Sequence, residues 1–438
     1  MKRVVIIGNS MAGVKVIQEL LTASNEFSFT IICTHGKLPC NRNLFPELVN
    51  KTIALDDVFY KTEAYYQKHK IQIINEAKIT RVNLKRKKVY CDDKQHLDYD
   101  ILIFSDTPDH KFPEIKGNNK KGLFGLRKLT DVQQIQDELP LCETIAIQSN
   151  SMYGLKIALA LAERNKEVVL ISSLKGIGVD GLGNNDTGWI LDWLRNKGVA
   201  MILENEIVEV LGDGYAKAVR LKSGKVLASQ MVLFENIYED FRFLNETDVI
   251  DENKIRVNDY FETKVNDVFA LDCVTQTPVQ NYGDVLPEFY LEEQSLMVSS
   301  KLLNKEREAY WPQLNQRIYH KEGSLIFSGA LNHTNFLEKN DSENKRYLKV
   351  FLYNDQIQGY ILINADSEEE KIQKLMQQGV TLSPTDQFVL DSQLSFEQII
   401  DKLQQGSKIS EEIQAESAAI VPVGSPQPDP IHHDMENS

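Results

Sequence analysis

The sequence predicts an α/β fold with two Rossmann-like three-layer domains, the second inserted in the first, and a small C-terminal α+β domain. A strand, a turn of small residues, a helix and a second strand follow one another over residues 4–32. The same order returns over residues 144–171, which makes an internal repeat. Shorter strands and helices follow after residue 320 and predict the third domain.

The first repeat begins with residues 4–7, a continuous apolar and β-branched run typical of a strand buried in a parallel sheet. The turn after it reads GNSMAG over residues 8–13, and residues 14–21 place apolar side chains on one helical face. Residues 29–32 supply the second strand. A helix that starts directly after such a turn can hold a pyrophosphate at its N-terminus. Ser10 replaces the middle glycine and crowds the closest approach to a phosphate.

The second repeat has a strand at residues 144–148, a turn at 149–154 and a helix at 155–162. Its turn shares the letters N-S-M-x-G-x-K with the first turn. Both leading glycines are replaced, by Ser149 and Ser151. This turn therefore predicts a phosphate site less well than the first turn does.

The composition argues against several other classes of protein. A net charge of −14 disfavours nucleic acid or an anionic membrane as the main partner. The apolar run near the N-terminus is too short for a signal peptide or a membrane span, so we expect a cytoplasmic protein. The five cysteines are scattered and form no CxxC pair, so we expect neither a disulfide framework nor a metal site.

Five segments of the sequence are similar to motifs of a known family: residues 8–14, 39–44, 79–82, 99–103 and 268–273. In order and spacing they resemble the pyridine nucleotide–disulfide oxidoreductase superfamily, and most of all its NAD(P)H–rubredoxin reductases and the flavoprotein module of NADH-dependent nitrite reductases. The resemblance implies FAD in the first Rossmann domain and NAD(P)H in the second. It also implies electron transfer to a small redox protein or to another subunit of a larger complex.

The resemblance also implies which residues bind the cofactors. Arg42 is expected beside the isoalloxazine or the phosphates, the backbone at Ile79 beside the adenine, and Asp272 on the flavin. The full set of candidates is Gly8, Ser10, Met11, Ala12, Gly13, Arg42, Ile79, Thr107 and Asp272 for FAD, and Ser149, Ser151 and Gly154 for NAD(P)H. No catalytic residue is assigned, and Cys40 is either a thiol near the flavin or a plain small-residue replacement.

Several of the letters that should face the nucleotide depart from the family pattern. The departures on the flavin side are Ser10, His35, Asp106, Thr107 and Leu271. If each cost about 1 kcal/mol of binding, affinity for FAD would fall by roughly three to four orders of magnitude. Three hypotheses follow: a FAD-dependent NAD(P)H oxidoreductase, a protein that binds FAD without pyridine nucleotide, or a pseudoenzyme that acts as a binding or assembly subunit.

The preference between NADH and NADPH stays open. Ser172 and Ser173 stand where an acidic residue would select NADH, and Lys175 lies close enough in sequence to meet a 2′-phosphate or to remain solvated.

The expected domain boundaries follow the repeats. We expect a FAD-binding-type domain at residues 1–110 and 250–315, an NAD(P)-binding-type domain at 111–249, a C-terminal domain at 316–405 and a disordered tail at 406–438.

The C-terminal domain has its own predicted elements. Residues 348–353 and 360–363 read as strands joined by a turn at 354–356, with helices at 368–378 and 395–403. Such a domain could cover a sheet edge, pair two copies of the chain as a homodimer, or dock a carrier protein.

Overall fold

The computed structural model describes residues 1–381 with the exception of short segments: 35, 76, 93–95, 107–109, 180, 236–237, 240, 245–248, 252–253, 276–285, 309–314 and 380. The chain divides into two compact parts, Met1–Ile318 and Tyr319–Ser438. His35, Thr107, the helix expected at 395–403 and the tail expected at 406–438 lie outside the described residues.

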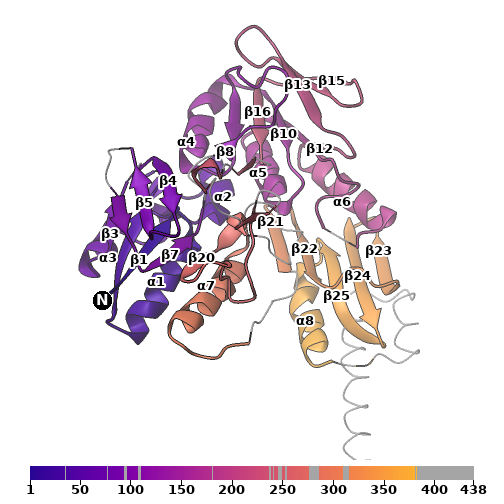
Figure 1. The fold of residues 1–438 in the computed structure, drawn as a ribbon. Helices are drawn as coiled ribbons and strands as arrows, with labels where there is room; N and C mark the ends of the chain where they lie inside the picture. The colour runs from indigo at the N-terminus through magenta and orange to yellow at the C-terminus, as the bar shows by residue number, and fades with distance from the viewer. Residues whose placement is uncertain are drawn as a thin grey trace, which may run out of the picture. The chain divides into compact units, whose positions relative to one another are not determined.

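A five-stranded parallel sheet forms the centre of the first Rossmann domain (Figure 1). Its strand order is β20-β7-β1-β2-β3, so after β3 the chain returns to the other side of β1 to form β7. The strands are β1 (Lys2–Ile7), β2 (Phe27–Ile32), β3 (Gln72–Ile74), β7 (Ile101–Phe104) and β20 (Val268–Ala270).

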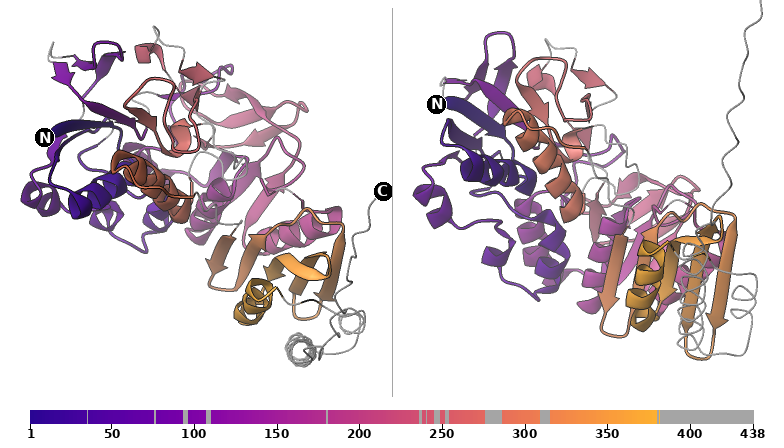
Figure 2. Two further views of the ribbon diagram at one scale, coloured as in Figure 1. Left: turned by 60° about the horizontal axis from the view of Figure 1, so that its bottom comes forward. Right: turned by 90° about the horizontal axis from the view of Figure 1, so that it is seen from below.

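The alternation of side chains along β1 explains the three layers. Val4 and Ile6 point to one face, where they pack with α1 (Met11–Ala23) and α7 (Glu288–Leu302). These two helices lie side by side (Figure 2). Val5 and Ile7 point to the other face, where they pack with a small antiparallel sheet. That sheet contains β4 (Ile79–Asn83), β5 (Lys88–Cys91) and β6 (His96–Asp98).

The second Rossmann domain repeats this plan with a parallel sheet of order β12-β11-β10-β16-β9. Its strands are β9 (Leu123–Gly125), β10 (Thr144–Gln148), β11 (Glu167–Ile171), β12 (Val199–Ile202) and β16 (Met231–Phe234). Its helices are α4 (Leu129–Glu138), α5 (Met152–Glu163) and α6 (Asn184–Asn196), and its antiparallel sheet contains β13 (Ile207–Leu211), β14 (Ala218–Leu221) and β15 (Val226–Ala228). In this repeat β10 corresponds to β1, β16 to β7 and α5 to α1.

Short elements connect these layers. They are η1 (Arg42–Leu44), α2 (Phe45–Asn50), η2 (Leu55–Val58), α3 (Glu63–Lys68), β8 (His110–Lys111), η3 (Leu139–Leu141), β17 (Tyr238–Glu239), η4 (Arg242–Leu244), β18 (Ile250–Asp251), β19 (Lys254–Ile255) and η5 (Asp272–Val274).

The C-terminal domain is a five-stranded sheet of order β21-β22-β25-β24-β23 with one helix packed on its core. The elements are β21 (Asn315–His320), β22 (Gly323–Gly329), β23 (Asn335–Asp341), β24 (Arg346–Tyr353), β25 (Gln356–Ile363), η6 (Asp366–Glu368) and α8 (Glu369–Gln377). The predicted hairpin is present, with Asn354 and Asp355 in the left-handed region that a tight turn requires. Strand β23 is not predicted from the sequence, because its polar letters show no clear alternation. The predicted fold class, two Rossmann-like domains and a small α+β domain, is confirmed.

Gly154 allows the N-terminus of α5 to approach the central sheet. A Cβ atom at this position would lie 2.0 Å from Ser149 Oγ and 2.9 Å from a carboxylate oxygen of Glu235. By contrast, a Cβ atom at Gly188 in α6 would meet nothing within 4 Å. The close packing of α5 against the second sheet therefore requires a glycine at position 154, whereas α6 does not require one at position 188.

We expect Gly154→Ala to lower the melting temperature, because overpacking of this kind costs about 1–3 kcal/mol. The control Gly188→Ala should raise it slightly, since an alanine in a free helical position stabilises by about 0.4–1 kcal/mol. Scanning calorimetry measures both, and equal shifts in the two variants would contradict the packing assigned to Gly154.

Candidate functional site

The candidate site lies where β1, β7 and β20 end and α1 begins. Gly8 follows β1 with a φ of 119°, and a Cβ there would lie 2.5 Å from both the Cβ and the backbone nitrogen of Asp106. At Gly13, a Cβ would lie 2.8 Å from Ile6 Cγ2. The first glycine gives the turn its shape, and the second lets α1 approach the sheet.

Ser10 caps α1 and connects it to Asp272. The Ser10 hydroxyl accepts a hydrogen bond from the Ala12 N–H at 3.1 Å and donates one to Asp272 Oδ2 at 2.5 Å. Asp272 itself adopts a left-handed conformation with a φ of 60°. Its backbone is held on both sides, because its N–H donates to Gln294 Oε1 at 2.6 Å and its carbonyl accepts from Thr275 Oγ1 at 2.9 Å. A rigid carboxylate therefore faces the start of α1.

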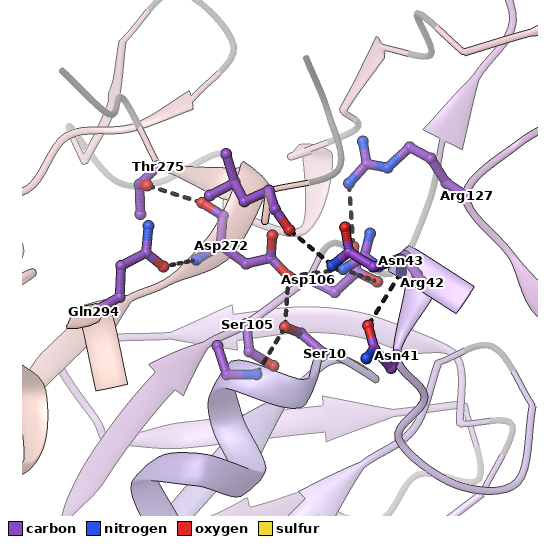
Figure 3. A network of polar contacts seen from close by, with 12 residues as sticks. Ser10, Asn41, Arg42, Asn43, Ser105, Asp106, Arg127, Asp272, Thr275 and Gln294 are labelled. Carbon is purple, nitrogen blue, oxygen red and sulfur yellow. Dashed lines mark hydrogen bonds and ion pairs between the residues drawn. The ribbon is translucent and has the colours of Figure 1, made fainter. Parts of the chain in front are cut away.

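Two arginines complete what we call the arginine–aspartate cluster, which consists of Ser10, Arg42, Asp106, Arg127 and Asp272 (Figure 3). Arg42 Nη2 lies 3.0 Å from Asp272 Oδ2 and 3.5 Å from Asp106 Oδ2. Arg127 Nη2 lies 3.4 Å from Asp106 Oδ1. Every member is at most 6% exposed, so each charge is compensated by the neighbouring side chains of the cluster and not by water.

The cluster leaves little free space at the turn. The cavity lined by Ser10, Met11, Arg42 and Asp272 has a volume of about 10 Å³. A volume of about 10–15 Å³ is the minimum for one water molecule. The diphosphate position of the first domain is therefore filled by the chain's own side chains in this conformation.

The side chains of the cluster are of the kinds that bind FAD, although the cavity beside them is too small to hold its diphosphate. A helix N-terminus and two guanidinium groups are the groups that bind a diphosphate. In this arrangement Asp106 holds both Arg42 and Arg127. FAD binding therefore requires the two arginines to exchange Asp106 for the diphosphate.

The structure brings together only part of the predicted flavin set. Ser10, Arg42 and Asp272 meet in the cluster, and Met11 lines its small cavity. Ala12 is fully buried in the first turn of α1. Ile79 lies apart from the cluster, in the core on the other face of the sheet. Sequence reasoning missed Arg127, which precedes α4 and carries no motif of its own.

In the second Rossmann domain, a carboxylate again lies against the helix N-terminus. The Ser149 and Ser151 hydroxyls each donate a hydrogen bond to Glu235, one to each carboxylate oxygen. Ser151 also caps α5 by accepting from the N–H of Tyr153 at 3.1 Å. Glu235 is fully buried directly after β16. Sequence reasoning missed Glu235; the available signal was an acidic residue that follows an entirely apolar strand.

A larger cavity of about 720 Å³ lies next to this turn. Its walls include Gln148, Asn150, Ser173, Glu206 and Ile207. The Asn150 side chain spans the edge between the turn and β11, because its Nδ2 donates to Ser173 Oγ at 2.8 Å and its Oδ1 accepts from the Ser173 N–H at 2.9 Å. The second domain therefore has open space at the end of β11 and a carboxylate at the phosphate end.

Cys40 does not have the properties of a reactive thiol. It is 6% exposed, and burial raises its pKa to about 12, although the charge of Arg42 acts in the opposite direction. Burial likewise raises the pKa of Cys33 to about 12. Since the thiolate is the nucleophile, a protonated buried thiol favours the small-residue replacement over a thiol that reacts near the flavin.

We expect iodoacetamide at pH 8 to label the partly exposed Cys91 much faster than Cys33 or Cys40, because both buried thiols stay protonated far above that pH. Peptide mass spectrometry of the native protein measures the three rates. Labelling of Cys40 at the rate of Cys91 would show an activated thiol and contradict this assignment.

Removal of one cation from the cluster should be costly. Arg42→Met leaves two buried carboxylates with less compensation, and we expect a loss of about 3–5 kcal/mol in stability. The control Arg3→Met removes an ion pair with Asp100 at 3.0 Å whose side chains are 50% and 41% exposed, so its cost should stay below about 1 kcal/mol. Urea denaturation followed by circular dichroism compares them, and similar midpoints would contradict a cooperative buried cluster.

Two broader features of the described residues concern metals and membranes. They contain no group of three or more His, Cys, Asp or Glu side chains arranged to hold a metal ion. Among them there is also no helix with the length and apolar character needed to cross a bilayer.

Comparison with known proteins agrees with this architecture. The sequence model of the "pyridine nucleotide-disulphide oxidoreductase" family matches residues 2–285. Nitrite reductase [NAD(P)H] of Bacillus subtilis (strain 168) is 24% identical over 410 residues, which cover 90% of this chain and 50% of that protein. The assimilatory nitrate reductase electron transfer subunit of the same organism is 23% identical over 85% of this chain and 48% of its own length. The chain thus spans about half the length of these relatives.

Solved structures share the fold at low sequence identity. Putidaredoxin reductase in its covalent complex with putidaredoxin aligns with a TM-score of 0.76 and 16% identity, over 93% of this chain and 99% of that chain. NADH:rubredoxin oxidoreductase from Clostridium acetobutylicum aligns with a TM-score of 0.67 and 18% identity, over 92% and 99%. The predicted resemblance is confirmed, and the chain belongs to the pyridine nucleotide-disulphide oxidoreductase family.

Proposed function

We propose that this chain is a FAD-dependent oxidoreductase that receives electrons from NAD(P)H and passes them to a small redox protein or a partner subunit. The single observation that carries the proposal is the buried arginine–aspartate cluster at the N-terminus of α1. It keeps two guanidinium groups, a capped helix end and Asp272 in one place. Two buried guanidinium groups beside a helix N-terminus are the groups that would compensate the charge of an anionic ligand at this turn.

The chain's own residues have separate roles in this proposal. FAD, when bound, supplies the hydride and electron chemistry. Arg42 and Arg127 would compensate the charge of its diphosphate, the N-terminus of α1 would offer backbone N–H groups, and Asp272 would be a hydrogen-bond acceptor for the cofactor. Asp106 competes with the diphosphate for both arginines and so sets how tightly FAD binds.

The electron acceptor is proposed from the relatives. One is named an electron transfer subunit, and one solved structure is a complex with the small redox protein putidaredoxin. These names favour electron transfer over the alternative of a pseudoenzyme. A cytoplasmic location and pairing of two copies through the C-terminal domain remain predictions from the sequence.

Because Asp106 competes with the diphosphate for the arginines, removal of its charge should strengthen FAD binding. We expect Asp106→Asn to bind FAD about tenfold or more tightly than the wild type, because it removes one negative charge next to the diphosphate while keeping the side-chain shape. Arg42→Met should weaken binding by about the same factor or more. Equilibrium dialysis with FAD measures both, and the visible flavin absorption should bleach when NADH or NADPH is added without oxygen.

The control for this test is Arg3→Met, which changes a charge on the exposed surface and should leave FAD binding unchanged. A protein that remains colourless with FAD, both as the wild type and as Asp106→Asn, would contradict the proposed function and support the pseudoenzyme. A flavin that binds but does not bleach with either nucleotide would contradict only the NAD(P)H step.

A further inference from the structure

The two Rossmann domains allow an internal comparison, because their central strands share one register. Ile7 of β1 pairs with Phe104 of β7, and Gln148 of β10 pairs with Phe234 of β16. The next residues are therefore equivalent: Ser105 in the first domain and Glu235 in the second. Their backbone bonds agree, since the Ser105 N–H donates to the Ile7 carbonyl at 2.8 Å and the Glu235 N–H donates to the Gln148 carbonyl at 3.1 Å.

The side chains at this shared position differ in charge and reach. Ser105 is short, and its hydroxyl donates back to the Ile7 carbonyl at 3.2 Å. Glu235 extends across the turn, where both of its oxygens accept hydrogen bonds from serine hydroxyls. One of these serines, Ser151, is the N-cap of α5. The carboxylate of Glu235 therefore lies at the positive end of the helix, where a diphosphate would bind.

The two turns also differ in how they hold an anion. In the first domain the carboxylates of Asp106 and Asp272 lie against two arginines, which a phosphate could bind by displacing Asp106. In the second domain, the hydrogen bonds to Glu235 described above come from neutral serine hydroxyls. A diphosphate in the second domain would therefore have to displace the buried carboxylate of Glu235 from the hydroxyl groups at the start of α5.

The rest of the second site is open. The cavity of about 720 Å³ extends along Asn150, Ser173 and Ile207, beyond the end of β11, which is the nucleoside side of a Rossmann fold. Space is therefore present for a nucleoside, and Glu235 blocks only the phosphate side.

We infer that Glu235 is the specificity-determining residue of the second Rossmann domain, where its carboxylate takes the diphosphate position, disfavours NAD(P)H and leaves a site for an uncharged nucleoside. The inference deepens the proposed function, because it concerns the domain that would take NAD(P)H. It means that the wild-type chain binds the pyridine nucleotide weakly and that Glu235 must leave the turn before a dinucleotide can bind.

The test is calorimetric titration of the full chain with adenosine, ADP and NADH, each with and without saturating FAD. The wild type should bind adenosine at least as tightly as ADP or NADH, since the added phosphates meet the carboxylate. Glu235→Gln removes the charge at constant shape, and Glu235→Ser installs the residue of the first domain. Both should bind ADP and NADH about tenfold or more tightly than the wild type and leave adenosine binding unchanged within about twofold.

The matched control is Glu206→Gln, which removes the same charge from the wall of the same cavity. It should raise NADH affinity much less than Glu235→Gln does. Unchanged adenosine binding shows that the variants keep a folded site.

Three results would overturn the inference: a wild type that binds NADH more tightly than adenosine, equal gains from Glu206→Gln and Glu235→Gln, or a chain that binds none of the ligands in any variant. A chain that never binds FAD would contradict the proposed function alone, because the titrations without flavin still report on Glu235.

Discussion

The N-terminus of a helix that begins at the end of a parallel strand presents unpaired N–H groups and the positive end of the helix dipole. In a dinucleotide-binding fold, a phosphate normally supplies the negative charge at this point. In this chain carboxylates supply it: Asp272 is bonded to the cap of α1, and Glu235 to the cap of α5. Both helices are thus satisfied without a ligand, and this constraint determines what each domain can bind.

The same solution has different consequences in the two domains. The first domain keeps cations next to its carboxylates, so a diphosphate has Arg42 and Arg127 to bind once it displaces Asp106 from them. In the second domain the carboxylate of Glu235 itself lies on Ser149 and Ser151, so a diphosphate must displace it from the cap of α5. With the roles proposed for Asp106 and Glu235, flavin binding and pyridine nucleotide binding would be separable in this chain. An intermediate function, with FAD bound and electrons supplied slowly or by another donor, follows from the same asymmetry.

The sequence was sufficient for the architecture because the signals there are local and repeated. Buried β-branched strands, the turns at Gly8 and Ser149 and the two helices after them predicted both Rossmann domains, and Asp272 and Arg42 were predicted at one site. The polar cluster was harder to predict, because it depends on which side chains meet across long sequence separations. Arg127 reaches Asp106 from the start of the second domain, and Glu235, which follows β16, reaches Ser151, which follows the neighbouring strand β10. No spacing rule encodes either contact, and only the odd placement of an acid after an apolar strand marked Glu235.

A crystal structure of the protein grown with both FAD and NADH is the measurement that tests the central claim most directly. The account predicts a FAD diphosphate bound by Arg42 and Arg127, with Asp106 displaced from both. It also predicts that, wherever NADH occupies the second domain, Glu235 has left Ser149 and Ser151. Electron density for an NADH diphosphate at the cap of α5 while Glu235 stays bonded to Ser149 and Ser151, or for a FAD diphosphate while Asp106 stays bound to both arginines, would contradict it.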